Sequence, residues 1–369
     1  MTKAAELAKM GEVLTNSQIG GRRNIIINGG MICSQRATSA TGLGDGTVGY
    51  KVLDRFRLQK AGSPNARYTM TQDSNTPSGF ANSMKLEVTT ATTSFASSDH
   101  QYIDQFIEAQ NLQQLAYGTS SAERITLSFY VKCSTAQTFA LDLKNEDNTR
   151  YFNTTYTVSS ADTWERKIIT FPGDTASGFN NDNGRGLRVR WTLVAGSDLT
   201  DGSVSTAWSS TETIATNHEN TWVGATGRTW QLTGVQLEVG DQATPFEHRS
   251  FGEELKLCER YFQKLAHDDD DREVGSGLET AVGQVNICYQ YYGGAMRAIP
   301  TCGSSSATEG YRFISGTDED NRKDNIPIIN QIGKKSCQFV NNQDTVGGGD
   351  GARLFLNTSG AELTFDADL

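Results

Sequence analysis

Hydrophobic and polar residues alternate over short stretches of this chain, separated by loops rich in Ser, Thr, Asn, Asp and Gly. Residues 125–131 and 187–193 show the pattern most clearly, with an apolar side chain at every second position. Such alternation is typical of a strand with one buried face. The strands expected before residue 248 are residues 24–28, 50–59, 83–89, 101–108, 125–133, 138–144, 151–158, 165–171, 187–194 and 229–239. This spacing predicts a mainly β fold, with a jelly-roll β-sandwich at residues 23–248.

The polar stretches between these strands are predicted loops, among them residues 91–98, 172–186 and 196–220. The last loop is long, and long loops in compact domains often bind ligands. Trp191 and Trp230 lie inside alternating strands, so we expect both rings in the core.

A second β region follows at residues 282–369. Residues 284–292 alternate cleanly, as a half-buried strand does. Further strands are expected at residues 311–314, 335–340, 352–357 and 361–365. We interpret this region as a separate C-terminal β domain.

Two short helices are expected outside the β regions. In residues 1–22, Leu7, Met10 and Leu14 line one side of an amphipathic helix before a Gly-containing hinge. This helix is either a terminus packed onto the body of the protein or an anchor that docks the chain onto a larger assembly.

The second helix is expected at residues 249–265, at the start of a segment, residues 249–281, that ends in an acidic linker. Its apolar residues are spaced by four, three, four and three positions: Phe251, Leu255, Cys258, Phe262 and Leu265. Such a heptad-like seam is too short to be stable alone and favours self-association, although it does not fix the number of copies.

The charge and the apolar content of the chain argue against some classes of partner. The formal net charge is −10, whereas a nucleic-acid-binding protein normally has a basic face, so we expect no nucleic acid. No run approaches the roughly 18 apolar residues of a membrane span, so we expect no membrane insertion. The first residues lack the apolar segment of a signal peptide, and we expect the chain to fold in a cytoplasm.

The six cysteines form no CxxC pair, and without a signal peptide we expect free thiols. Cys33, Cys133 and Cys258 lie in apolar runs and are expected to be buried. A disulfide between two of the last three, Cys288, Cys302 and Cys337, remains open.

No motif for catalysis or metal binding stands out. The four histidines are scattered, and the sequence contains neither HExxH nor GxSxG. Asp268–Asp271 are consecutive and lack the spacing of a calcium loop, so we interpret them as a solvated linker. We therefore expect no metal, no cofactor and no enzymatic activity.

Two separated groups of motifs carry a family resemblance. Residues 24–31, 35–36 and 54–56 read NIIINGGM, QR and DRF, and residues 235–240, 243–247, 249–250 and 258–262 read VQLEVG, ATPFE, RS and CERYF. In this order they resemble the start and end of the jelly-roll module in bacteriophage tail-fibre proteins, especially those of marine and cyanobacterial phages. Gly30 stands where Ala is common, and Ala37 where Gly usually follows the Arg.

The resemblance implies a homotrimeric virion tail fibre. Its N-terminal helix would attach to tail adaptor or nozzle proteins, and the jelly roll, which resembles carbohydrate-binding modules, would form the body. The helix at residues 249–265 would join the copies. The C-terminal domain would be the distal tip that binds a bacterial surface glycan or outer-membrane receptor.

Exposed aromatic rings are candidates for receptor contact, because a ring face stacks against a sugar. Trp208 lies in a Ser/Thr-rich loop, and Trp222 is a second candidate. In the C-terminal domain, Tyr292 and Tyr311 belong either to a packed core or to the receptor surface.

Two other functions fit the same sequence. A virion decoration or adaptor protein would share the fold without binding host cells. A depolymerase would cleave surface polysaccharide with a pair of carboxylic acids, but the many acidic residues do not single out a pair.

Overall fold

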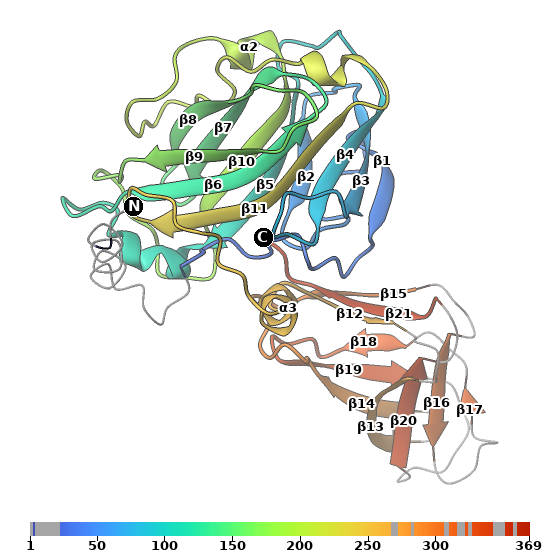
Figure 1. The fold of residues 1–369 in the computed structure, drawn as a ribbon. Helices are drawn as coiled ribbons and strands as arrows, with labels where there is room; N and C mark the ends of the chain where they lie inside the picture. The colour runs from blue at the N-terminus through green and yellow to red at the C-terminus, as the bar shows by residue number, and fades with distance from the viewer. Residues whose placement is uncertain are drawn as a thin grey trace. The chain divides into compact units, whose positions relative to one another are not determined.

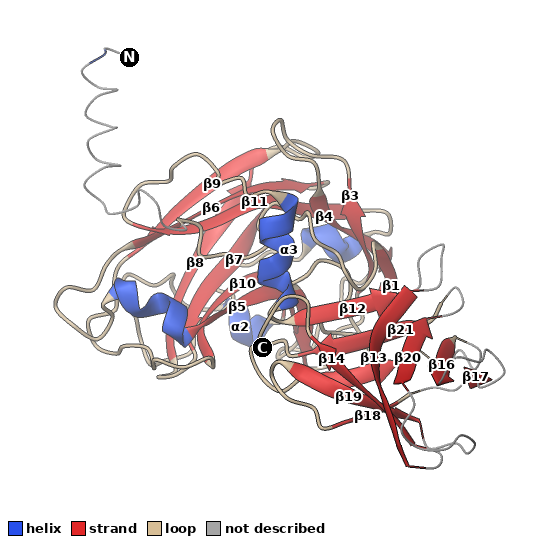
Figure 2. Cartoon of the chain, turned by 90° about the horizontal axis from the view of Figure 1, so that it is seen from below, coloured by secondary structure: helices blue, strands red, loops and turns tan. Residues whose placement is uncertain are grey.

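A computed structural model of the chain describes Lys3 and residues 23–266, 272–281, 284–305, 310–315, 322–323, 327–341, 351–356 and 360–369. The chain divides into two compact units, Met1–Ser250 (unit 1) and Phe251–Leu369 (unit 2). Both are built from antiparallel strands, and the described helices are short (Figures 1 and 2). The prediction of a mainly β chain with a β-sandwich is confirmed. Leu7, Met10, Leu14 and Asp268–Asp271 lie outside the described residues.

Unit 1 is a sandwich of two sheets. The six-stranded sheet contains, in order, β1 (Ser39–Leu43), β3 (Arg67–Asp73), β4 (Ser83–Thr90), β11 (Thr229–Val239), β6 (Ile125–Cys133) and β9 (Glu165–Phe171). The five-stranded sheet contains β2 (Arg57–Ala61), β5 (His100–Glu108), β10 (Arg185–Ala195), β7 (Gln137–Asn145) and β8 (Arg150–Val158). Short helical turns lie in the connections: η1 (Ala109–Leu115), α2 (Ser197–Thr200) and η2 (Thr221–Gly224).

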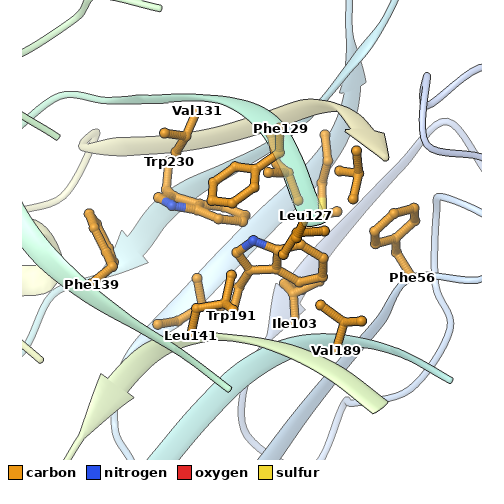
Figure 3. Packing of buried hydrophobic residues seen from close by; sticks show 14 of the residues in the cluster. Phe56, Ile103, Leu127, Phe129, Val131, Phe139, Leu141, Val189, Trp191 and Trp230 are labelled. Atoms are coloured by element: carbon orange, nitrogen blue, oxygen red, sulfur yellow. The ribbon is translucent and has the colours of Figure 1, made fainter. Parts of the chain in front are cut away.

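The core of unit 1 lies between the two sheets, where every second side chain of the facing strands meets (Figure 3). Trp191 and Phe129 pack edge to face, with ring centroids 5.9 Å apart. Trp191 and Trp230 are fully buried, as their place in alternating strands predicted.

The motif segments at residues 24–31 and 235–247 meet in space and close this sandwich. The Asn24 amide donates to the Val235 carbonyl (3.0 Å) and accepts from the Leu237 N–H (3.1 Å). Glu247 accepts from the N–H groups of Arg23 and Asn24. Residues 24–28 therefore form an irregular segment fixed by side-chain hydrogen bonds, not the strand that their apolar run predicted. These motif residues stabilise the fold.

Unit 2 contains two further sheets. The smaller has the order β12 (Phe262–Ala266), β21 (Glu362–Asp366), β15 (Thr301–Ser304). The larger has the order β17 (Arg322–Lys323), β16 (Tyr311–Ser315), β20 (Gly351–Leu356), β13 (Arg272–Ala281), β14 (Gln284–Gln290), β19 (Ser336–Asn341), β18 (Ile328–Asn330). Aromatic residues from both sheets, including Tyr289, Phe339 and Phe365, share one core.

The predicted helix at residues 249–265 is wrong in its second half. Helix α3 spans only Phe251–Glu259, and the chain continues as β12, in which Leu265 pairs with Leu363. Cys258, Phe262 and Leu265 are buried in unit 2, whereas Phe251 is 58% exposed and Leu255 is half-buried. A short helix gains little stability on its own. The residues after Glu259 therefore pair with the distant strand β21, although their apolar spacing is that of a helix. The five residues do not form a continuous helical seam.

Candidate functional site

A row of polar side chains crosses all five strands of one sheet in unit 1. Arg57 on β2 lies opposite Asp104 on β5, and Asp104 opposite Arg190 on β10. Arg190 in turn lies opposite Asp142 on β7, and Asp142 opposite Asn153 on β8. The residues before and after them on these strands belong mostly to the core, so these five side chains face the outer side of the sheet. We call them the polar row.

Two ion pairs lie within the polar row. Arg57 donates to both carboxylate oxygens of Asp104, at 2.9 and 2.7 Å. Arg190 donates from Nε to Asp142 Oδ1 at 2.6 Å, and both side chains are at most 4% exposed. Burial raises the pKa of Asp142 against the opposing effect of the Arg190 charge. Burial lowers the pKa of Arg190, but Asp142, with smaller contributions from Tyr102 and Asp104, raises it overall. The row therefore alternates positive and negative groups, with no net charge.

Several polar atoms of the row have no hydrogen-bond partner within the described part of the chain. They are Asp142 Oδ2, Arg190 Nη2, and both the nitrogen and the oxygen of the Asn153 side-chain amide. A buried polar atom left unpaired costs about 1–3 kcal/mol. These atoms all lie on β10, β7 and β8, so unused donors and acceptors are concentrated at one end of the row.

Aromatic rings flank the row, but arginines cover their faces. The guanidinium groups of Arg185 and Arg57 lie 4.3 and 4.6 Å from the ring centroid of Phe106. The guanidinium of Arg190 lies 5.0 Å from that of Tyr102. Because Phe106 is 1% and Tyr102 8% exposed, the face offers hydrogen-bonding groups more than bare rings for stacking.

The predicted long loop, residues 196–220, covers the β8 end of the row. Ser205 donates its backbone N–H to the Asn153 carbonyl (2.8 Å), and Tyr151 and Ser209 exchange a pair of backbone hydrogen bonds (2.8 and 3.0 Å). Ile214 packs in a small apolar cluster with Tyr151. At the other end of the row, the Arg57 side chain is 12% exposed. The row is thus covered at β8 and partly open at β2.

Two buried histidines lie next to this face. His218, at the end of the covering loop, accepts a hydrogen bond at Nδ1 from the Ala140 N–H (3.2 Å), and burial lowers its pKa to about 4. His100 contacts the Thr192 hydroxyl through Nε2 (3.2 Å), and burial lowers its pKa well below the usual value. Both rings are neutral in the folded protein at neutral pH.

These histidines predict that acid destabilises unit 1. In the unfolded chain His218 binds a proton below about pH 6.5, whereas in the folded chain it stays neutral until the pH falls to about 4. Protonation therefore favours the unfolded chain, and the free energy of unfolding falls as the pH drops through this range. We expect His218 to account for a loss of about 2 kcal/mol between pH 7.5 and pH 5. All five tryptophans precede Ser250, so urea unfolding of the full chain followed by Trp fluorescence reports on unit 1.

The matched variant for this measurement is His218→Asn, whose amide oxygen can replace Nδ1 as the acceptor. It should remove much of the loss at pH 5, leaving the part due to His100. An unchanged pH profile in this variant would contradict the assignment to His218.

Three of the four candidate receptor-binding rings are buried. For Trp208 and Trp222 this corrects the prediction of an exposed contact, whereas Tyr311 follows the alternative of a packed core. Trp208 is 7% exposed and donates from Nε1 to the Pro172 carbonyl (2.7 Å). Trp222 is fully buried and stacks on Tyr68. Tyr311 is fully buried, and its hydroxyl donates to the Glu362 carbonyl (2.6 Å). Each polar tip has found an internal acceptor, which allows the ring to be buried.

Tyr292, the fourth, is 61% exposed. It lies in unit 2, and the structure does not bring it together with the other three rings into one site. The polar row was missed, although a signal was present: charged residues occupy the polar positions of three alternating strands. Arg188, Arg190, Asp104 and Asp142 all follow this pattern.

Among the residues that the structure describes, no group of three or more His, Cys, Asp or Glu side chains is placed to hold a metal ion. No described helix is long and apolar enough to cross a membrane.

No protein-family model matches the chain, and no curated protein matches it. Solved structures with a similar fold include carbohydrate-binding modules and a phage tailspike domain. One is the enzymatically active domain of tailspike protein 4 of bacteriophage CBA120, with 10% identity and a TM-score of 0.31, covering 58% of this chain and 21% of that chain.

Two others are carbohydrate-binding modules. The family 11 module from Clostridium thermocellum, in complex with a β-1,3-1,4-mixed-linked tetrasaccharide, is 15% identical with a TM-score of 0.28, covering 56% of this chain and 99% of that chain. TmCBM61, in complex with β-1,4-galactotriose, is 9% identical with a TM-score of 0.29, covering 59% and 99%. These scores are too low to transfer a binding site to this chain.

Proposed function

We propose that the chain is a phage tail-fibre protein that attaches to a host cell by binding a surface glycan, and that unit 1 binds this glycan through the polar row. The observation that carries the proposal is the set of unpaired donors and acceptors on Asp142, Arg190 and Asn153. A sugar hydroxyl both donates and accepts, so an oligosaccharide can satisfy these atoms together.

The chemistry of the row favours a glycan over other ligands. The charges of its two arginines and two aspartates cancel, and the whole chain is acidic. A polyanionic ligand would therefore gain little electrostatic attraction from this face. The guanidinium groups over Phe106 and Tyr102 leave little bare ring surface for an apolar ligand. The resemblance to tail-fibre modules at residues 24–56 and 235–262 supports the place in a virion. Binding requires no bond cleavage, and we propose no enzymatic step.

The covering loop must lift for the glycan to reach Asn153, which is fully buried. The backbone contacts that hold the loop along β8 include the Ser205–Asn153 and Ser209–Tyr151 hydrogen bonds. Two backbone-paired residues on adjacent antiparallel segments are about 5.5 Å apart at Cα, which suits a disulfide.

A disulfide clamp tests whether the loop must lift. The double variant Tyr151→Cys/Ser209→Cys should bind glycan when reduced and lose at least 90% of its binding when oxidised, because the loop can no longer open. The native chain under the same oxidant controls for the native cysteines. Equal binding by the oxidised and reduced double variant would contradict loop opening.

The function itself is tested by applying the purified full-length chain to an array of bacterial surface glycans. We expect selective binding to a small set of structurally related oligosaccharides, competed by the same free oligosaccharides. If no glycan on a broad array is bound, and host cells are not bound either, the proposed function is wrong.

A further inference from the structure

Two cysteines of unit 2 lie on either side of a stacked ring pair. Cys302 on β15 is the register partner of Phe365 on β21, and Cys337 on β19 is the register partner of Tyr289 on β14. The rings of Phe365 and Tyr289 stack with centroids 5.4 Å apart and an interplanar angle of 14°. This packing places one thiol from each sheet of unit 2 beside the same ring pair.

The two thiols belong to the same core. Cys337 is one of the buried residues of the unit 2 cluster, and Cys302 packs against that cluster. Each thiol also shifts the pKa of the other. Cys337 is buried at 2% exposure, whereas Cys302 is partly accessible. A soluble oxidant therefore reaches Cys302 first.

The environment also makes the two thiols chemically different. The influence of Cys337 lowers the pKa of Cys302, whereas the influence of Cys302, together with burial, raises the pKa of Cys337. The thiolate is the reactive form, so Cys302 has the character of the attacking thiol and Cys337 that of the resolving thiol.

We propose that Cys302 and Cys337 are a redox-active pair that forms an intramolecular disulfide when the chain meets a small disulfide oxidant such as glutathione disulfide. The Cys302 thiolate attacks one sulfur of the oxidant, which breaks its S–S bond and releases one glutathione thiolate. Cys337 loses its proton to solvent and attacks the Cys302 sulfur of the mixed disulfide, releasing the second glutathione. Two protein thiols are oxidised, and one small disulfide is reduced to two thiols.

The bond would join the three-stranded sheet of unit 2 to its seven-stranded sheet. It closes a chain segment of roughly 35 residues, which restricts the unfolded state. We expect the melting temperature of unit 2 to rise by roughly 10 °C on oxidation. Unit 2 contains no Trp, so calorimetry of the full chain shows this shift in the transition that Trp fluorescence does not report.

The test incubates the full-length chain with glutathione disulfide and measures its intact mass and its peptide map without reduction. The expected product has lost two hydrogens and gives a peptide that links Cys302 to Cys337. Cys302→Ser removes the attacking thiol and should give no such product. Cys337→Ser removes the resolving thiol and should stop at a mixed disulfide that carries one glutathione on Cys302.

Cys288→Ser is the matched control, because Cys288 is exposed on β14 and its removal should leave the Cys302–Cys337 link intact. Two outcomes would overturn the proposal. In the first, both thiols stay reduced or each carries its own glutathione. In the second, the link forms between different cysteines. Neither outcome depends on whether unit 1 binds a glycan.

Discussion

Arg190→Met is expected to lower the free energy of unfolding of unit 1 by about 3–5 kcal/mol, because it leaves the Asp142 carboxylate buried without its cation. Asp142 is 0% exposed, and Arg190 is the partner of its Oδ1 at 2.6 Å. Methionine retains much of the volume of the arginine stem, so the loss comes mainly from the missing charge. Urea unfolding followed by Trp fluorescence at pH 7.5 measures the change.

The double variant Arg190→Met/Asp142→Leu separates this explanation from simple packing damage. Replacing a buried ion pair as a whole by apolar residues is often neutral or stabilising. We therefore expect the double variant to recover most of the stability that the single variant loses. If the double variant is as unstable as Arg190→Met, the loss arises from packing and not from an unpaired carboxylate.

The second large effect is on binding. Asn153→Ala is expected to weaken glycan binding at least tenfold without lowering the free energy of unfolding, because it removes two buried polar atoms that have no partner. Neither atom of the Asn153 amide has a hydrogen-bond partner in the described structure, so its removal breaks no internal hydrogen bond. A ligand that pairs with the amide loses those bonds.

Thr157→Ala is the matched control, since Thr157 lies on the same strand and the same face as Asn153 but outside the polar row. It is exposed, and its substitution should leave affinity unchanged. Affinity is measured by titration calorimetry with the tightest-binding oligosaccharide from the array. Equal losses in both variants would show a general disturbance of β8, and no loss in Asn153→Ala would remove the amide from the site.

Much of the sandwich could be predicted from alternation alone, because a strand with one buried face imposes a period of two on its sequence. The stretches at residues 125–133 and 187–194 are β6 and part of β10, and their inward residues form the core. The prediction from alternation was wrong where side-chain hydrogen bonds replace the backbone pairing of strands, as at Asn24. It also failed where a helical spacing ends in a strand, as at Phe262, because the partner strand β21 lies about 100 residues later in the sequence.

The candidate site was harder to predict for a physical reason. Arg57, Asp104, Arg190, Asp142 and Asn153 become one row only through the register of four strand pairs, which no local pattern determines. Trp208 was misjudged because a distant contact, and not its sequence neighbours, decides its burial. A polar neighbourhood along the sequence around Trp208 did not reveal that its indole N–H would find the Pro172 carbonyl.

The most direct test of the proposed site is a crystal structure of the full-length chain soaked with the tightest-binding oligosaccharide from the array. The account predicts a sugar on the outer face of the five-stranded sheet, with hydroxyls in hydrogen-bonding contact with Asp142 Oδ2, Arg190 Nη2 and the Asn153 amide, and with the loop at residues 196–220 displaced from β8. A sugar bound only in unit 2, or elsewhere on unit 1 with the polar row still covered, would contradict it.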